Sequence, residues 1–272
     1  MPKIAVLIPC YNEASRLKKE EFIRFASEHP QINFLFVNDG STDKSVDVIN
    51  KFLTDSRIKL FSTENHGLSE ARNFGLSKAK GEFISFVDSD DYVSDNYVEL
   101  LYESLNKNNA DFAFCNFNYD KNKVISQNDS LKDAVLDNRT FWDFYYETSS
   151  MVSSVAWNKM FKVSSLKDTK YKSRAYHEDE FFINELLPKT NKFVFINEYL
   201  YFYRLRENSI TTNKKILSPR YLDTIKYNLE RCTYFVKSNF EISIIRHCFN
   251  EGIFNVLKYH ERLPKEVKEE LD

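Results

Sequence analysis

Glycine is scarce in this sequence, which contains 5 glycine and 6 proline residues among 272. The turn after the first apolar run, residues 9–13, has no glycine at all. Dinucleotide-binding Rossmann enzymes need a glycine-rich turn at that point, because the backbone must approach a pyrophosphate closely. Nucleotidyltransferases would need a glycine-rich phosphate loop near the N-terminus. The sequence therefore disfavours both classes of enzyme.

Cysteines are few and far apart. Cys10, Cys115, Cys232 and Cys248 form no CxxC pair. Neither a zinc site nor the disulfide framework of a small secreted protein is therefore indicated. We expect four free thiols in a reducing cytoplasm.

Long apolar runs are also missing. No run approaches the roughly 20 residues of a membrane-spanning helix, and residues 3–9 are too short for the apolar core of a signal peptide. We expect a cytoplasmic protein with at most a peripheral contact at the inner membrane face. Basic and aromatic residues of one segment could make that contact, although a solvated helix face is the favoured interpretation. They are Lys214, Lys215, Arg220, Tyr221, Lys226 and Tyr227.

The charge balance is close to even, with a formal net charge of −2. Nothing in it indicates a nucleic-acid partner. Aromatic residues are plentiful, with 24 Phe and 16 Tyr. A chain of this length buries about three quarters of its unfolded surface, so we expect most of these rings in a large core. An aromatic binding groove is the alternative.

Strand-like and helix-like patterns alternate in the first half of the chain. Residues 4–8 form a continuous apolar run that Pro9 stops, which is typical of a strand buried on both faces. The alternation predicts an α/β fold with a mostly parallel central sheet flanked by helices. We expect strands at 4–8, 32–37, 58–61, 83–87 and 112–117, and helices at 17–28, 45–53, 68–78 and 96–105.

The second half is less regular. Residues 120–140 are polar and indicate a loop, whereas 157–163 and 193–203 have strand-like composition. Helical patterns begin at Pro219 and at Ile242. We therefore divide the chain into a domain at 1–212, with halves at 1–118 and 119–212, and a C-terminal helical segment at 213–272.

Polar residues follow the predicted strands of the first half, at the points where the strands end. Tyr11-Asn12-Glu13 comes after the first strand, Asp39 after the second and Asp88-Ser89-Asp90-Asp91 after the fourth. Ligands of open parallel sheets bind outside the carboxyl ends of the strands. We therefore expect these residues to meet in one crevice.

The acidic run at 88–91 has three carboxylates within four residues, which repel one another unless a cation neutralises them. Mg²⁺ and Mn²⁺ prefer carboxylate and phosphate oxygens. A metal held by one or two carboxylates can stabilise a diphosphate leaving group. A solvated acidic turn is the alternative, but the position after a buried strand favours the metal.

A second polar segment, Asp39-Gly40-Ser41-Thr42-Asp43, is typical of an Asx-turn that leads into a helix. Asp39 precedes that turn at the end of the strand. Its carboxylate could accept a hydrogen bond from a base or a ribose.

An ordered set of segments resembles the family 2 glycosyltransferases, inverting enzymes with the GT-A fold. The resemblance covers about residues 3–212, and the six pieces together are far more specific than any one of them. The pieces are Pro9-Cys10-Tyr11-Asn12-Glu13, then Asp39 to Asp43, then Asn65 to Gly75, then Gly81 to Asp91, then Trp157-Asn158-Lys159-Met160-Phe161, and finally His177-Glu178-Asp179-Glu180 with Leu200 to Arg204, Arg206 and Ser209.

The resemblance implies roles on the side of a nucleotide-sugar donor, most simply a UDP-sugar. Pro9, Tyr11, Asn12 and Glu13 would line the nucleotide pocket, and Asp39 would bond the base. The remaining implied donor contacts are Arg72, Asp88 and Ser89, with Lys159, Arg204 and Arg206 as further candidates. Asp90, together with Asp88, would hold Mn²⁺ or Mg²⁺.

The resemblance also implies that Asp179 is the general base. Inversion by single displacement needs one base, which takes a proton from the attacking acceptor hydroxyl. Charge neutralisation, rather than a protein acid, assists the leaving diphosphate. Glu178 and Asp179 are neighbours, and only one of them is expected to act; the family pattern favours Asp179. An acidic helix N-terminus is a compatible second role.

The expected acceptor is a hydroxyl of a glycan or of a lipid-linked saccharide. Trp157 could stack on an acceptor sugar, although core packing is favoured. A catalytically inactive GT-A domain that serves as a sugar-nucleotide-binding or scaffold module is the alternative function. The presence of both Asp90 and Asp179 argues against it. The sequence gives no oligomeric state.

Overall fold

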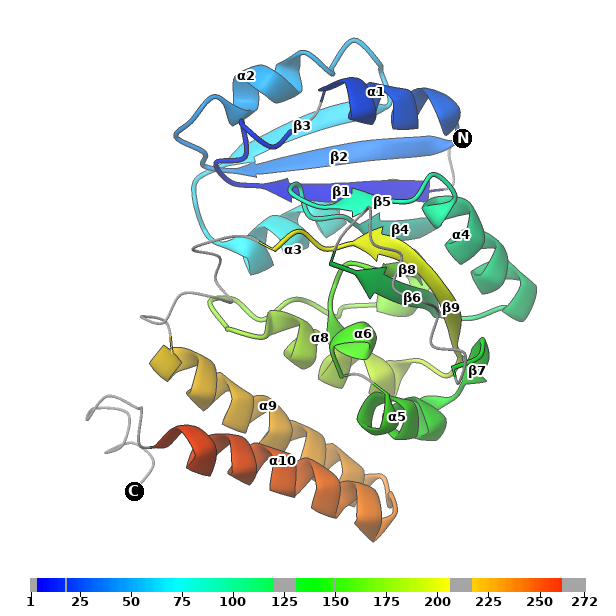
Figure 1. The fold of residues 1–272 in the computed structure, drawn as a ribbon, viewed down its shortest axis with the longest axis vertical. Helices are drawn as coiled ribbons and strands as arrows, with labels where there is room; N and C mark the ends of the chain where they lie inside the picture. The colour runs from blue at the N-terminus through cyan, green and yellow to red at the C-terminus, as the bar shows by residue number, and fades with distance from the viewer. Residues whose placement is uncertain (1–3, 18, 120–130, 149, 206–216, 261–272) are drawn as a thin grey trace.

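The computed structural model describes residues 4–17, 19–119, 131–148, 150–205 and 217–260. A nine-stranded sheet forms its centre, in the order β3-β2-β1-β4-β8-β6-β9-β5, with β7 paired to β9 (Figure 1). The strands are β1 Ile4–Cys10, β2 Ile32–Asp39, β3 Ile58–Thr63, β4 Phe83–Phe86, β5 Tyr92–Val93, β6 Phe112–Asn118, β7 Ala134–Leu136, β8 Lys159–Lys162 and β9 Phe193–Phe202. The helices are α1 Lys19–Glu28, α2 Ser45–Asn50, α3 Leu68–Lys78, α4 Tyr97–Asn108, α5 Asn138–Glu147, α6 Ser150–Ser154, α7 Val163–Leu166, α8 Glu178–Leu186, the 3-10 turn η1 Leu187–Lys189, α9 Leu217–Lys237 and α10 Ile242–His260.

The first four strands confirm the predicted parallel arrangement. β1 lies between β2 and β4 and is parallel to both, and β2 is parallel to β3. Side chains alternate along β1, so that Ala5 and Leu7 enter one apolar core while Ile4, Val6 and Ile8 enter the other. Helices α1, α2 and α4 cover the second core, and α3, α5 and α8 cover the first. This double burial explains the uninterrupted apolar run of β1.

The second half of the sheet mixes strand directions. β8 enters between β4 and β6 and is antiparallel to both, whereas β6 and β9 are parallel. The mostly parallel sheet that we expected is therefore found up to β4, and antiparallel pairs prevail beyond it. Asn158, just before the four-residue strand β8, has a φ of +63°, in the left-handed region. The sheet continues across residue 118, and the division into halves stays a prediction.

The loop that we expected at 120–140 is wrong at its C-terminal end. Residues 120–130 lie outside the described part, but β7 and the start of α5 follow within the predicted loop. Asp137 begins α5 with a capping box: its carboxylate accepts from the backbone N–H of Thr140, and the Thr140 hydroxyl accepts from the N–H of Asp137. This signal is visible in the sequence as Asp-x-x-Thr.

The C-terminal helical segment is confirmed. Helices α9 and α10 run side by side at the end of the molecule opposite β3 (Figure 1). Phe235 of α9 and Phe240, in the turn that follows it, join the core that contains Trp142 of α5. Within the described ranges, no helix is long and apolar enough to cross a membrane.

Gly75 fixes the approach of α3 to the sheet. A Cβ atom added to Gly75 would lie 2.1 Å from Cδ1 of Leu7, which is completely buried in β1. We expect Gly75→Ala to lower the free energy of unfolding by about 1–3 kcal/mol through overpacking. The sign is opposite to the usual effect, since Ala normally stabilises the interior of a helix relative to Gly. Denaturant titration measures this. Ser77→Ala, at an exposed position of the same helix, is the matched control, and equal stabilities of the two variants would contradict the prediction.

Candidate functional site

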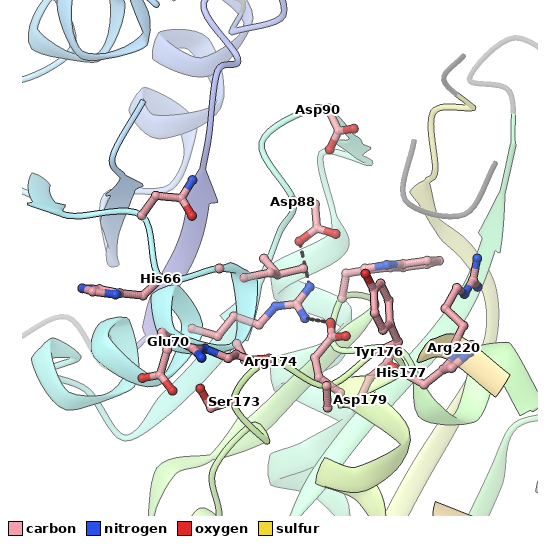
Figure 2. Close-up of a pocket in the computed structure, with 18 of the residues that line it drawn as sticks. His66, Glu70, Asp88, Asp90, Ser173, Arg174, Tyr176, His177, Asp179 and Arg220 are labelled. Carbon is pink, nitrogen blue, oxygen red and sulfur yellow. Dashed lines mark hydrogen bonds and ion pairs between the residues drawn. The ribbon is translucent and has the colours of Figure 1, made fainter. Parts of the chain in front are cut away.

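A cleft of about 900 Å³ opens at the carboxyl ends of the first strands. Asp88 and Asp90, which follow β4, line it together with residues 65–70, residues 173–179, Trp157, Tyr203 and Arg220 of α9. In Figure 2, Asp88 and Asp90 occupy the upper part of the view, and Asp179, His177 and Arg220 occupy the lower part. The cleft therefore brings together side chains from both halves of the chain and from the C-terminal helices.

Arg72 of α3 connects the two acidic segments. Its guanidinium donates to Asp88 Oδ1 at 3.2 Å and to Glu178 Oε1 at 2.6 Å, and its side chain is 3 % exposed. Asp88 and Glu178 raise the pKa of Arg72 against the opposing effect of burial, so the side chain stays charged. The ring of Tyr171 supports the guanidinium from a centroid distance of 5.3 Å. Arg72 thus lies in the cleft, where we expected a donor contact.

The acidic run after β4 is tied to the end of β9. The Tyr201 hydroxyl accepts from the Asp88 backbone N–H at 3.1 Å and donates to Asp91 Oδ2 at 2.8 Å. Asp91 Oδ1 also accepts from the backbone N–H of Arg204. Burial, with the charges of Asp88 and Asp90, raises the pKa of Asp91 to about 8. Asp91 therefore has a structural role, while Asp88 and Asp90 face the cleft.

Three consecutive acids begin helix α8. Glu178 and Asp179 both line the cleft, and of the three acids Asp179 has no ion pair with a cationic side chain within the described residues. Glu178 bonds Arg72, and Glu180 bonds Arg231 of α9. Asp179 Oδ1 accepts from the Glu180 backbone N–H at 3.2 Å. Burial raises the pKa of Asp179 to about 7, the charges of Glu178 and Glu180 add to this, and Arg72 opposes it. A carboxylate with this pKa suits proton transfer near neutral pH.

Asp39 is buried at the end of β2, beside the cleft rather than in its lining. Its two carboxylate oxygens accept from the backbone N–H groups of His66 and Gly67, both at 2.8 Å. Asp39 thereby holds the 65–67 loop, which does line the cleft. Each oxygen retains a second lone pair, so a contact with a base stays a prediction.

The segment after β1 packs mainly against the turn after β2. Asn12 has a φ of +56°, and its side-chain oxygen accepts from the backbone N–H of Thr42 at 2.8 Å. The Glu13 N–H donates to Ser45 Oγ, and its carboxylate pairs with Arg16. Pro9 is buried inside β1, and Tyr11 is 48 % exposed. Of this segment, Tyr11 offers the most surface to a ligand.

Lys159 corrects one of our expectations. Its side chain is completely buried in β8, and the ammonium donates to the Val152 carbonyl at 2.9 Å and to Asn158 Oδ1 at 2.8 Å. Burial lowers the pKa of Lys159 to about 7. Lys159 does not line the cleft, so a direct donor contact has no support in this geometry.

Three further predicted donor contacts are Arg204, Arg206 and Ser89. Arg204 lies over the Tyr92 ring at 4.3 Å from its centroid and is outside the cleft lining. Ser89 lines a smaller cavity under α1 instead of the main cleft. Arg206 lies outside the described residues. None of these three therefore has a demonstrated place in the cleft.

The loop at 173–176 forms much of the cleft wall. Arg174 has a φ of +55°, and no motif marks the loop. Arg220 and Tyr227 belong to the segment for which we favoured a solvated helix face over a membrane contact. Arg220 lines the cleft, and Tyr227 is buried against Phe181 and Arg231, so Tyr227 is part of neither kind of surface. Lys214 and Lys215 lie outside the described residues.

Trp157 packs in the core, as we favoured, and it also borders the cleft; its contact with an acceptor sugar stays a prediction. It is 4 % exposed and stacks on Tyr201 and Tyr203, with ring centroids 4.5 and 5.3 Å away. Its remaining surface and Tyr203 line the cleft. Stacked aromatic rings at a cleft edge suit the apolar face of a sugar.

The sequence of the chain matches a known protein family. The family model for "Glycosyl transferase family 2" matches residues 5–169, more than half of the chain. The chain belongs to glycosyl transferase family 2. The match ends before Asp179, so the assignment is independent of the α8 acids.

Individual relatives agree with the family assignment. The chain is 33 % identical over 219 residues to glycosyltransferase GlyA of Streptococcus pneumoniae serotype 4. The aligned region covers 77 % of this chain and 31 % of GlyA. This chain thus spans about a third of that glycosyltransferase.

Solved structures share the fold. Staphylococcus aureus TarS 1–349 in complex with UDP-GlcNAc has a TM-score of 0.73 at 17 % identity, over 98 % of this chain and 77 % of that one. Mannosyltransferase PcManGT from Pyrobaculum calidifontis, in complex with GDP-Man and Mn²⁺, has a TM-score of 0.57 at 14 % identity, over 99 % and 78 %. These likenesses confirm the expected GT-A type of fold.

The family's divalent metal can be tested against the carboxylates present. Across the described ranges, no three His, Cys, Asp or Glu side chains form a complete metal site. Asp88 and Asp90 nevertheless lie in the cleft, and their charges contribute to the raised pKa of Asp91. Arg72 pairs with Asp88, and the remaining negative charge of this acidic run fits a cation held by one or two carboxylates, with substrate phosphate oxygens as the other ligands.

Proposed function

We propose that this chain is an inverting glycosyltransferase, which moves a sugar from a UDP-sugar to a hydroxyl of a glycan or lipid-linked saccharide. Asp179 is the general base, and Asp90 with Asp88 would hold Mn²⁺ or Mg²⁺. The observation that carries the proposal is one cleft that contains the acids after β4 and, in α8, a carboxylate with a pKa of about 7. The UDP-GlcNAc bound by TarS and the Mn²⁺ bound with GDP-Man by PcManGT support the donor class and the metal.

The proposed reaction is a single displacement. The acceptor oxygen attacks the anomeric carbon as Asp179 takes its proton, and the bond from that carbon to the diphosphate oxygen breaks on the opposite side. The new glycosidic bond therefore has inverted configuration, and UDP leaves. A divalent cation, when bound, neutralises charge that develops on the diphosphate. Glu178 stays paired with Arg72, which leaves Asp179 as the base.

Two parts of the cleft would receive the two substrates. The donor lies toward Asp88, Asp90 and the 65–67 loop that Asp39 holds. The acceptor lies toward residues 173–177, Trp157 and Arg220, so that its hydroxyl meets Asp179. A cleft of about 900 Å³ falls within the roughly 300–1,000 Å³ of small-molecule sites.

Calorimetry with UDP and Mn²⁺ tests this function. We expect UDP to bind about tenfold more tightly with Mn²⁺ than with EDTA, a difference of about 1.4 kcal/mol, because the cation would be held jointly by the carboxylates and the diphosphate. UDP release from UDP-GlcNAc, UDP-glucose and UDP-galactose should then reveal Mn²⁺-dependent turnover with at least one of them. UDP binding without any turnover would favour a sugar-nucleotide-binding scaffold, and no UDP binding would reject the donor class.

A further inference from the structure

Helix α9 contacts the catalytic segment at several points outside the family match. Its Asp223 carboxylate accepts from the Tyr176 backbone N–H at 2.8 Å. Its Arg231 donates to Glu180 Oε2 at 2.6 Å and to Asn184 Oδ1 at 2.8 Å, both on α8. The Asn184 side chain in turn donates to the Tyr227 carbonyl of α9. The loop before α8 and the first two turns of α8 are therefore both held by α9.

The Arg231–Glu180 pair is enclosed by aromatic rings. The Arg231 side chain is completely buried, and the Glu180 side chain is 10 % exposed. The rings of Trp142, Tyr145 and Tyr227 lie 4.4, 4.6 and 5.3 Å from the guanidinium carbon. The Tyr145 hydroxyl donates to both Glu180 oxygens, at 3.0 and 3.1 Å. A buried ion pair is weak evidence for stability, because apolar residues of similar volume often stabilise as well. Its retention here therefore needs another explanation.

The start of α8 offers that explanation. The residue before the helix, His177, has a φ of +57° and makes no side-chain capping bond. The residue before it, Tyr176, is held by Asp223 of α9, so the chain that enters α8 is fixed in part from outside the helix. Successive helical side chains point about 100° apart, so the three acids at 178–180 cannot share one target. Arg72 holds Glu178 from α3, and Arg231 holds Glu180 from α9. Asp179 lies between these two fixed side chains and lines the cleft.

We propose that Arg231 is a positioning residue, which acts through Glu180 to orient the N-terminal turn of α8 and hence Asp179. The C-terminal helical hairpin is then a part of the catalytic apparatus, although Arg231 touches no substrate. This inference rests on the proposed role of Asp179 as the base.

The double variant Glu180→Gln/Arg231→Met tests the inference. It removes both charges with little change in volume, which avoids an unpaired buried charge. We expect the kcat for UDP release, counted per UDP-binding site by calorimetry, to fall about 10–100-fold, because a displacement of about 1 Å can cost a factor of 10². The affinity for UDP with Mn²⁺ should stay within about twofold, a change well below 1.4 kcal/mol.

The pH profile gives a second readout. The charged or titratable groups that act on Asp179 are Glu178, Glu180, Arg72, Tyr171 and Lys159. Glu180 raises the pKa of Asp179. In the double variant the fall of kcat at low pH, its acid limb, should therefore move to lower pH. A loss of stability alone would leave this limb in place.

Glu230→Gln is the matched control. It breaks the exposed Lys172–Glu230 pair one residue before Arg231 on the same helix, and kcat and the acid limb should not change. Should the double variant lose its UDP-binding sites, Arg231→Lys replaces it, since Lys keeps the charge but lacks the planar fork. A several-fold loss of kcat per site in Arg231→Lys supports the inference, and wild-type kcat overturns it.

The possible failures are distinguishable. A double variant with wild-type kcat per site and an unmoved acid limb, beside an inactive Asp179→Asn enzyme, would overturn this inference alone. An active Asp179→Asn enzyme would overturn both the proposed base and the positioning role.

Discussion

Replacing Asp179 by Asn should reduce sugar transfer by about 10²–10⁴-fold, the range that general bases typically contribute. The amide keeps the shape of the side chain but cannot take the proton of the acceptor hydroxyl. UDP binding should hardly change, because the acidic residues after β4 and the 65–67 loop are untouched. Calorimetry and UDP release, measured on the same preparation, separate the two effects.

The pH dependence of the wild-type enzyme belongs to the same prediction. Burial first, and then Glu178 and Glu180, raise the pKa of Asp179 to about 7. The base must be ionised, so kcat should rise with pH up to about 7 and fall tenfold per unit below it. The Asn variant should lack this acid limb in its residual activity. Glu178→Gln is the comparison: loss of the limb there, with Asp179→Asn still active, would assign the base to Glu178.

Replacing Asp90 by Ala should lower Mn²⁺-dependent turnover by about 10³-fold, since a Lewis-acid metal contributes several kcal/mol. Asp90 is 5 % exposed and lines the cleft beside Asp88. The variant should also need more Mn²⁺ for half-maximal rate, which a metal titration of UDP release measures. Asp95→Ala removes an exposed acid that pairs with Arg24 and serves as the control. An unchanged Mn²⁺ requirement in Asp90→Ala would disprove the metal assignment.

The sequence predicts the first half of the fold closely, for a physical reason. β1 is buried on both faces and α3 lies over it, so the apolar pattern there is complete, and the predicted helix at 68–78 coincides with α3. The acids after β4 follow from strand order alone, because carboxyl ends of parallel strands share an edge. Local pattern and tertiary structure agree in this half.

The rest depends on partners that are distant in the chain. Arg72 and Glu178 are 106 residues apart, and Glu180 and Arg231 are 51 apart. No periodic pattern in the sequence predicts such pairs. Lys159 was expected to contact the donor because the segment 157–161 resembles the family, whereas a local carbonyl and an amide bind its ammonium inside the core. The antiparallel direction of β8 depends on its pairing with β4 and β6, which composition does not reveal.

The uninterrupted sheet has a mechanical consequence. The pairs β4–β8 and β8–β6 join the two parts of the sheet without a gap, and α8 packs on β8 through Phe182 and Phe161. The strands on which the cleft stands therefore cannot separate without breaking strand pairs. The hydrogen-bonded sheet is therefore the stiff frame that sets the distance between the acids after β4 and the start of α8. Any adjustment to a sugar of different size falls to the loops that stand on this frame, such as residues 173–177. Such an enzyme would change its choice of substrate by altering these loops while its frame stays the same.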